Sequence, residues 1–569
     1  MTRSTDRMLA ETLDAATPLL RSPPFPDIDA AVTQPDCIAA TPSPGHDAIE
    51  HVFAAVRETR IGGRFWSPPI GQIRARVIVR ARSISEVPLL LAMLDDADRA
   101  AALWLPAQHG DRALARTLAR LGLTTCGDVD PWSALDGDVR LLAHGDDEWV
   151  ALAHIAGKPL HILSAGRFGA PGADTAHIRA RVTESLFRCR YRDPFTGQGA
   201  SIESAIAWLA DWRRTFEANR NIVAACGIAW WKRHEIARFL STPEHKLRFF
   251  RSERRAIAHA ARRGGSVAIW PSRVSAAITL AARAKGVPLV RIEDGFVRSV
   301  GLGSNLVPPS SIALDRLGIH YDPTRASDLE ALLAGASFPP SLLARAERLR
   351  QVILDAGISK YGGDSAHAFP QRQPGRRLVL VPGQVEDDMS VKLGGGGLAS
   401  NLELLRRARA LEPDAEIWFR PHPDVDAGHR KGTVRDEDAL RHADRVVRGG
   451  SMARLLELVD AVQVLTSLTG FEALLRGREV TCHGTPFYAG WGLTRDLAAV
   501  PERRGRRLTL DQLVAAVLIL YPRYLDPVTH LPCPPEILIH RMTDGSAHNR
   551  LGWVTRIRQF QGRLMKGRA

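Results

Sequence analysis

The sequence predicts an α/β protein made of successive Rossmann-like units, and its hydrophobic patterning leads to that prediction. From about residue 70, short apolar runs such as RVIVRA and AALWLP alternate with amphipathic stretches such as SEVPLLLAMLDDA and ALARTLARLG. The same alternation starts again after about residue 220, and once more after a Pro-, Gly- and Gln-rich break at 365–376. Strands that alternate with helices of this length predict parallel sheets with helices on both faces.

These restarts divide the 569 residues into five predicted segments. Residues 1–65 are rich in Pro, Asp, Thr and Ser, carry little periodicity, and are expected to form a loosely ordered leader. Residues 66–215, 220–370 and 375–530 each predict a Rossmann-like domain, and residues 531–569 predict a basic amphipathic tail. The last two domains, about 150 residues each and joined by a short linker, have the outline of the GT-B architecture.

An internal repeat makes the first of the three domains an incomplete copy of the last. The stretch from Gly157 aligns with the stretch from Gly477 at an offset of 320, and YRDP at 191–194 matches YLDP at 524–527. The copy is degenerate, because Glu472 corresponds to Leu152. A convergent strand–helix pattern could mimic part of this match, but the paired Tyr-x-Asp-Pro endings favour duplication. The fold class predicted is therefore α/β, of GT-B type, with a degenerate Rossmann-like domain in front.

The composition excludes several classes of protein. Six cysteines are widely scattered without a CxxC pair, which argues against a zinc site or a disulfide framework and for a reducing compartment. No apolar run reaches about 18 residues, and the N-terminal stretch lacks the long apolar core of a signal peptide. A cytoplasmic protein is expected.

The net charge of +14 predicts an anionic partner or substrate. Nucleic acid is the least favoured partner, because aromatic residues make up only 6% and no nucleic-acid-binding motif is present. An anionic lipid surface or an anionic small substrate remains. An arginine-rich surface without any such role would give the same net charge.

Four clusters of polar residues follow predicted strands, at the edge where doubly wound sheets bind ligands. The first is RIEDGFVRS at 291–299, which contains Glu293, Asp294, Arg298 and Ser299. An Asp-Gly turn with a helix cap would explain this cluster equally well on its own.

The second cluster is VPGQVEDDMSVK at 381–392, which contains Gln384, Asp388 and Lys392 and precedes four glycines. Its three consecutive acids would suit a solvated turn, a magnesium site or a carboxylate nucleophile. The glycines allow close approach of a phosphate, but the Lys-Ser/Thr of a Walker A motif is missing.

The third and fourth clusters suit a nucleotide. FRPHPD at 419–424 places Arg420, His422 and Pro423 at a strand end, where Arg420 and His422 could bind phosphate. TSLTGFE at 466–472 passes from strand to helix, so its hydroxyls and free N–H groups suit an anion and its carboxylate suits ribose hydroxyls.

From about 227 to 527 the chain resembles the capsule β-Kdo transferases of the KpsC type, most closely their C-terminal catalytic module. The motifs that carry the resemblance are GIAWWK, EDGFVRSVGLGS, PPSSIALDRLGIHYD, SKYG, VPGQVEDDMS, RPHPDV, TSLTGFEALLRG, TPFYAGWGLT and YPRYLDP. Members of this family usually carry two complete modules in tandem. This chain departs from that pattern, because its first module keeps only a degenerate later half.

The resemblance implies a retaining transferase that moves Kdo from CMP-Kdo and builds the poly-Kdo lipid linker of an exported capsular polysaccharide. It implies Asp388 as the carboxylate nucleophile and Glu293 as the acid/base. The residues expected to hold the donor are Gln384, Arg420, His422, Pro423, Thr466, Ser467 and Glu472. Arg298 or Lys392 would bind the sugar carboxylate, and Asp294 and Ser299 would contact the sugar or the acceptor. No metal and no cofactor other than the donor substrate is expected.

The C-terminal tail predicts a membrane-facing helix. Trp553, Ile557, Phe560 and Leu564 fall on one helical face, with arginines mostly elsewhere, as in interfacial helices on anionic lipid. Docking of this helix on the enzyme's own surface is the alternative. The resemblance implies a glycolipid acceptor based on lyso-phosphatidylglycerol, a location at the inner face of the inner membrane, and contact with a capsule export complex. A non-catalytic export or scaffold protein that retains the fold is the rival hypothesis.

Overall fold

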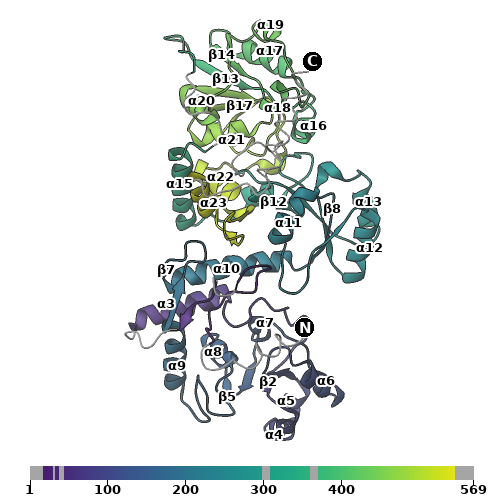
Figure 1. The fold of residues 1–569 in the computed structure, drawn as a ribbon, viewed down its shortest axis with the longest axis vertical. Helices are drawn as coiled ribbons and strands as arrows, with labels where there is room; N and C mark the ends of the chain where they lie inside the picture. Colours follow the sequence, from purple (N-terminus) through teal and green to yellow (C-terminus); the bar gives the residue numbers. More distant parts are fainter. Residues whose placement is uncertain (1–16, 30–32, 38–43, 298–307, 359–368, 545–569) are drawn as a thin grey trace. The chain divides into compact units, whose positions relative to one another are not determined.

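The computed structural model describes residues 17–29, 33–37, 44–297, 308–358 and 369–544. The chain divides into two compact units (Figure 1). Unit 1 comprises residues 1–220 with 240–246, and unit 2 comprises residues 221–239 with 247–569.

Unit 1 is built on a four-stranded parallel sheet in the order β3-β2-β4-β5. Its strands are β2 Val77–Ala81, β3 Ala102–Pro106, β4 Arg140–Ala143 and β5 Leu160–Ile162. The helices are α4 Val87–Ala92, α5 Asp96–Ala100, α6 Arg112–Arg120, α7 Pro131–Ala134, α8 Glu148–Ile155, α9 Thr175–Phe187 and α10 Ile202–Asn219. A second, small antiparallel sheet contains β1 Asp36–Cys37, β6 Cys189–Arg192 and β7 Gly199–Ala200.

The expectation of a loosely ordered leader at 1–65 is wrong for much of that segment. Helix α3, His46–Thr59, buries Val52, Phe53 and Val56. Leu19 and Leu20 are each only 1% exposed. The Pro-rich segments on both sides favoured an irregular structure, although the apolar residues between them recur at the spacing of an amphipathic helix. Residues 1–16 lie outside the described part.

The second sheet of unit 2 has six parallel strands in the order β15-β14-β13-β16-β17-β18, which is the strand order of a Rossmann fold. The strands are β13 Leu378–Pro382, β14 Glu416–Arg420, β15 Arg445–Val446, β16 Ala461–Val464, β17 Glu479–Cys482 and β18 Arg495–Asp496. The helices are α16 Met389–Gly394, α17 Asn401–Leu411, α18 Pro423–Asp426, α19 Asp436–Ala439, α20 Met452–Leu458 and α21 Leu468–Leu475. The strand order reverses at β13, so the carboxyl ends of β13, β14 and β16 form a crevice.

The first sheet of unit 2 is mixed and has the order β20-β19-β12-β11-β10-β8-β9. The strands are β8 Ile222–Cys226, β9 Arg248–Phe250, β10 Ser266–Ile269, β11 Leu289–Asp294, β12 Ser311–Asp315, β19 Pro522–Leu525 and β20 Pro532–Cys533. The helices α11 Arg233–Phe239, α12 Glu253–Arg263, α13 Ile278–Arg283, α14 Asp328–Gly335 and α15 Pro340–Asp355 accompany it. Only β8 to β11 are parallel, since β12, β19 and β20 pair antiparallel.

Two predicted boundaries are therefore wrong. Residues 522–525 were expected in the second Rossmann-like domain but join the first sheet as β19. Residues 531–543 were expected in a basic tail but form β20 and helix α23, Pro535–Thr543. Together with α22 Leu510–Val514, the yellow helix α23 packs against α15 (Figure 1). Sequence periodicity reports local structure, and it carries no information on which sheet a returning strand joins. The expected membrane-facing helix at 545–569 lies outside the described residues.

The repeat detected in the sequence has a structural counterpart in each unit. Helices α8 and α21 both have eight residues and begin 320 residues apart. The hydroxyls of Tyr191 and Tyr524 each donate to a main-chain carbonyl, at 2.9 and 2.7 Å. Asp193 and Asp526 each accept main-chain N–H groups in the turn that follows. The strand order β3-β2-β4-β5 also matches β14-β13-β16-β17.

Asp526→Ala should lower the free energy of unfolding of the chain by about 3 kcal/mol, because breaking a buried ion pair leaves a charge without its partner. Asp526 is 0% exposed and accepts two hydrogen bonds from Arg541, at 3.0 and 3.1 Å. Urea denaturation followed by circular dichroism measures the change. Asp193→Ala is the matched control and should cost about 1 kcal/mol, because the Asp193 carboxylate accepts main-chain N–H groups and makes no ion pair with a described residue. Equal losses in the two variants would contradict the expected contribution of the ion pair.

Candidate active site

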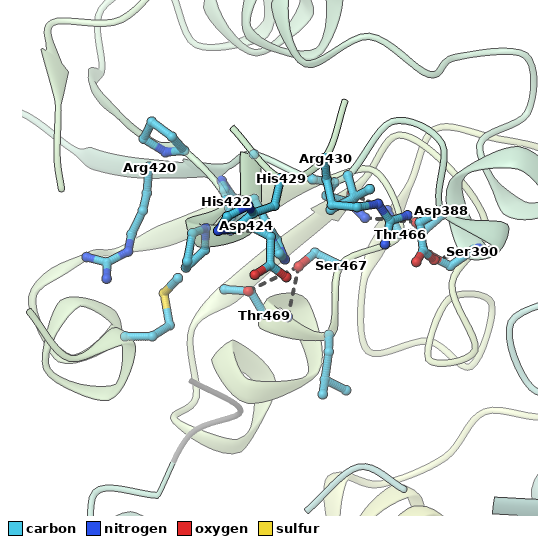
Figure 2. A pocket seen from close by; sticks show the side chains of 18 of the residues that line it. Asp388, Ser390, Arg420, His422, Asp424, His429, Arg430, Thr466, Ser467 and Thr469 are labelled. Atoms are coloured by element: carbon cyan, nitrogen blue, oxygen red, sulfur yellow. Dashed lines mark hydrogen bonds between the residues drawn. The ribbon is translucent and has the colours of Figure 1, made fainter. Parts of the chain in front are cut away.

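A cavity of about 480 Å³ lies in unit 2, at the carboxyl ends of β13, β14 and β16 (Figure 2). The loops that follow these three strands form most of its wall, and each loop enters a short helix: α16, α18 or α21. Residues at the end of β11 and after β8 form the remaining wall. The cavity therefore has contributions from both sheets of unit 2.

Gln384 ties the end of β13 to the end of β16. Its side-chain Oε1 accepts from the N–H of Thr466 at 2.9 Å, and its Nε2 donates to Oγ1 of Thr466 at 3.0 Å. Its main-chain N–H and C=O pair with the Asn401 carboxamide, both at 2.8 Å. Gln384 is 8% exposed, so these bonds are largely shielded from water. The residue fixes the floor of the cavity.

Asp388 begins helix α16 as its N-cap. One carboxylate oxygen accepts from the N–H of Ser390 at 3.0 Å and from the Ser390 hydroxyl at 2.8 Å. These contacts orient the carboxylate at the cavity wall. The helix-cap role and a chemical role are compatible, because a carboxylate has two oxygens and about four lone-pair sites.

Two predicted phosphate ligands, Arg420 and His422, have different surroundings at the end of β14. The guanidinium of Arg420 donates to the carbonyls of Gly449 and Gly450, and it lies apart from the other labelled side chains in Figure 2. His422 is the N-cap of α18, and its Nδ1 accepts from the N–H of Asp424 at 3.2 Å. That bond assigns the ring proton of the neutral histidine to Nε2. His422 is thus suited to donate to a ligand, whereas Arg420 braces a loop.

The loop after β16 presents hydroxyl groups at the entry of α21. Oγ of Ser467 accepts from the N–H of Thr469 at 3.2 Å and lies 3.1 Å from the Thr469 hydroxyl (Figure 2). The N-terminus of this helix carries a partial positive charge and points at the cavity. Hydroxyls and a helix N-terminus together favour a bound anion.

The opposite wall carries an ion pair, formed by Lys232 and Asp294. Nζ of Lys232 lies 2.7 Å from the carboxylate of Asp294 and 3.6 Å from the ring centroid of Trp270. Lys232 is only 7% exposed. A carboxylate and an aromatic face therefore hold the ammonium group in one place on the wall. Trp231 lines the cavity beside it.

Tyr321 interacts electrostatically with both predicted catalytic carboxylates, Glu293 and Asp388. Its hydroxyl is buried and has no hydrogen-bond partner among the described residues. Burial raises the pKa of Tyr321, and the negative charges of Glu293 and Asp388 raise it further. Glu293 itself accepts from the N–H of Asp294 at 3.1 Å at the end of β11.

The structure brings most of the predicted site residues to one cavity. Those that line it are Asp294, Gln384, Asp388, Arg420, His422, Pro423, Thr466 and Ser467. Glu293, Lys392 and Glu472 do not line it; Lys392 is exposed on α16 and Glu472 is buried within α21. Arg298 and Ser299 lie outside the described residues.

Sequence reasoning missed several residues of the cavity. Lys232 and Trp231 belong to the GIAWWK motif. This motif carries part of the family resemblance, but the sequence alone predicts no role for it. Arg430, whose guanidinium lies 3.2 Å from Asp387, and His429 follow the RPHPD motif along the chain. The clustered aromatic and basic residues of WWK were the available signal for Lys232.

The described residues contain no group of three or more His, Cys, Asp or Glu side chains that could hold a metal ion. The helices of the same residues are too short or too polar to span a bilayer.

Fold and cavity together define the class: a GT-B type protein with a cavity at the carboxyl ends of the second sheet. The capsule polysaccharide biosynthesis protein family matches residues 266–524. The capsule polysaccharide modification protein LipA of Neisseria meningitidis serogroup A is 40% identical over 341 residues, which are 60% of this chain and 48% of LipA. The chain thus spans about half the length of that relative.

Two further comparisons agree. The lipopolysaccharide-processing protein LpsZ of Rhizobium meliloti is 39% identical over 310 residues, which are 53% of this chain and 70% of LpsZ. The solved structure of Thermosulfurimonas dismutans KpsC, a β-Kdo 2,4 transferase, is 35% identical with a TM-score of 0.50, and the match covers 57% of this chain and 98% of that one. The chain belongs to the capsule polysaccharide biosynthesis family, and the KpsC-type resemblance carried by its motifs is confirmed.

The free energy of unfolding should fall as the pH is lowered from about 6.5 to about 4, because of the buried residue His483. Burial lowers the pKa of His483 from 6.5 to about 4, and its Nε2 donates to Oε1 of Gln463 at 2.8 Å. The unfolded chain takes up a proton below pH 6.5 that the folded chain refuses, so the contribution of the neutral ring is complete above that pH and is lost as the pH falls. At pH 5 the loss should be about 2 kcal/mol.

Urea midpoints near pH 7 and near pH 5 measure this effect, and His483→Gln should remove that part of the pH dependence. An identical pH dependence in the variant would contradict the assignment to His483.

Proposed function

We propose that the chain is a retaining glycosyltransferase that moves Kdo from CMP-Kdo onto a lipid-linked acceptor in capsule assembly. The observation that carries the proposal is the arrangement of the cavity. The hydroxyls and the helix N-terminus after β16, the histidine after β14, a buried lysine and the carboxylate of Asp388 on the loop after β13 all line one cavity. The 35% identity to a β-Kdo transferase supports the choice of substrate.

The nucleotide half of the donor fits the wall formed by the second sheet. His422 would donate from Nε2 to the CMP phosphate, and the hydroxyls of Ser467 and Thr469 at the start of α21 would complete the phosphate site. Arg420 would contribute indirectly, by holding the Gly449–Gly450 loop. Glu472 does not line the cavity, so the donor site proposed here does not include the ribose contact expected for it.

The sugar half would face Lys232. Kdo carries its own carboxylate, and a buried, fixed ammonium group is a suitable partner for it. Lys232 takes over the role expected for Arg298 or Lys392, because it lines the cavity and is 7% exposed. Asp294 keeps the ammonium oriented at 2.7 Å.

The reaction would proceed by double displacement. The Asp388 carboxylate attacks the anomeric carbon of Kdo, the bond from that carbon to the phosphate oxygen breaks, and CMP leaves with the electron pair. An acceptor hydroxyl then gives its proton to Glu293 and attacks the same carbon, and the ester bond to Asp388 breaks. Two inversions retain the configuration. Glu293 precedes the cavity-lining Asp294 at the end of β11, and Asp294 is itself the partner of Lys232.

The acceptor and the location are part of the proposal. A lyso-phosphatidylglycerol-type glycolipid would bring the reaction to the anionic inner face of the membrane, next to a capsule export complex. The surplus of positive charge, +14, favours such a surface.

Incubation of the full chain with CMP-Kdo and a synthetic Kdo-lipid, followed by mass spectrometry, tests the activity directly. The expected result is addition of at least one Kdo residue, and NMR of the product should show the β anomer. The absence of any transfer, with CMP bound normally, would favour a non-catalytic scaffold.

Asp388→Ala should lower the transfer rate at least about a thousand-fold, as expected for loss of a covalent nucleophile. Binding of CMP should be retained, because the carboxylate contacts the sugar and not the nucleotide. Isothermal titration with CMP is the control, and His422→Ala should lower CMP affinity there about ten- to hundred-fold. Turnover like that of the unsubstituted protein in Asp388→Ala would exclude the residue as nucleophile.

Lys232→Gln should raise KM for CMP-Kdo about ten- to hundred-fold, as expected for loss of a hydrogen bond to a charged group. The dissociation constant of CMP itself should hardly change, because the proposed contact is to the sugar carboxylate. A purely structural role for Lys232 would lower the melting temperature and weaken CMP and CMP-Kdo equally. That equal loss would contradict the assignment.

A further inference from the structure

Unit 1 contains a cavity of its own, of about 430 Å³. It is lined by residues that follow β2 and β3 and by the start of α8, which follows β4. In the order β3-β2-β4-β5 the strand sequence reverses at β2, so this cavity occupies the position at which doubly wound sheets bind ligands. It is the counterpart, in the repeat, of the candidate active site in unit 2.

The chemistry of this cavity excludes a nucleotide phosphate at the helix entry. Asp147 caps α8 where Ser467 caps α21. Its carboxylate lies 2.8 Å from Nε of Arg80, and Glu148 accepts from Arg21 at 2.5 and 3.0 Å. The protein's own carboxylates therefore occupy the place of an anion, and a phosphate there would meet like charge.

Among the described residues that line this cavity, one basic group makes no ion pair at contact distance, although the carboxylates of Asp128 and Glu148 act on it electrostatically. Asp146 is paired with Arg82, and Asp128 lies 2.6 Å from Nδ1 of His109. Arg64 lines the same cavity and makes no ion pair among the described residues. Its Nε is buried and finds no hydrogen-bond acceptor in that part of the chain.

The buried Nε of Arg64 lacks a hydrogen-bond acceptor among the described residues, which has an energetic cost. Desolvation lowers the pKa of Arg64 and the charge of Arg21 lowers it further, whereas the charges of Asp128 and Glu148 raise it. The guanidinium lies 5.3 Å from the ring centroid of Trp66, which orients it without supplying an acceptor. A buried donor without a partner calls for a specific explanation, and a guanidinium binds carboxylates in bidentate fashion.

We infer that this cavity is a second binding site, which takes the carboxylate of a sugar acid on Arg64. The guanidinium of Arg64 suits a carboxylate, whereas the nearby carboxylates would repel a dianion such as a phosphate monoester. Ser67, Gln108 and His109 supply hydrogen-bonding groups for sugar hydroxyls. The choice of a sugar acid rests on the proposed function; the site itself rests on Arg64.

Unit 1 would then bind a sugar acid without any catalytic carboxylate of its own.

Equilibrium titration of the full chain with free Kdo tests the inference directly. Lys232→Gln serves as the background, because it removes the proposed carboxylate contact in unit 2. Free Kdo should bind, its neutral methyl ester should not, and adding Arg64→Gln should weaken binding at least ten-fold. Arg116→Gln, at an exposed position of helix α6, is the matched control and should change nothing. Unchanged binding in Arg64→Gln, or equal binding of the ester, would overturn the inference.

Inorganic phosphate distinguishes a sugar-acid site from a general anion site. Phosphate should fail to displace Kdo at equal concentration, and equal displacement would overturn the sugar-acid assignment. Thermal melting separates ligand binding from a structural role. Because Arg64 lacks an acceptor without ligand, Arg64→Gln should leave the melting temperature unchanged or raise it. A marked fall would assign a structural role and contradict the inference; if the variant does not fold, Arg64→Lys replaces it in the titration.

The two proposals fail in different ways. Transfer from CMP-Kdo together with Arg64-independent Kdo binding would leave the function standing and remove the second site. Arg64-dependent binding without any transfer would leave a sugar-acid-binding protein and remove the enzymatic proposal.

Discussion

The candidate active site depends on the carboxamide of Gln384, which joins the ends of β13 and β16 at the point where the strand order of the second sheet reverses. The Oε1 and Nε2 atoms of the amide lie 2.9 Å from the main-chain N and 3.0 Å from Oγ1 of Thr466, respectively. In a largely water-free setting these bonds are strong, and leaving either partner unmet is costly. Because the two strand ends are fixed, the loops that carry Asp388 and Ser467 begin at defined positions. The positions of α16 and α21, which these loops enter, are thereby defined as well.

The same topology supports different chemistry in the two units. Asp147 and Ser467 both cap a helix of eight residues that follows a central strand, so the backbone arrangement survives the exchange. The side chains nevertheless reverse the electrostatics, because a carboxylate repels the anion that a hydroxyl accepts. Arg80 and Arg21 then neutralise the carboxylates of unit 1. A fold can therefore be retained while the class of ligand changes, as expected where function is determined by local groups on a common scaffold.

Several polar side chains that line the cavity of unit 2 are held in place by structural contacts. Asp388 orients itself by capping α16, and His422 acquires a defined tautomer by capping α18. Lys232 is held by Asp294 and Trp270. Each group is thereby fixed before any ligand binds, which reduces the reorganisation that binding and catalysis require. Arg420 differs from these groups, because its guanidinium donates to the carbonyls of Gly449 and Gly450.

The sequence by itself determined the alternating strands and helices, the GT-B class, the family and the meeting of clusters such as Gln384, His422 and Ser467. It could do so because parallel strands place their carboxyl ends at one edge, so residues that follow each strand converge. Only the tertiary structure decided that β19 returns to the first sheet, that Lys232 faces the cavity beside Asp294, and that Arg420 turns to a loop. Those outcomes depend on contacts between residues far apart in the chain, such as Arg523 of β19 with Ile312 of β12. Local periodicity cannot report such contacts, because packing and charge pairing select among arrangements that the same pattern permits.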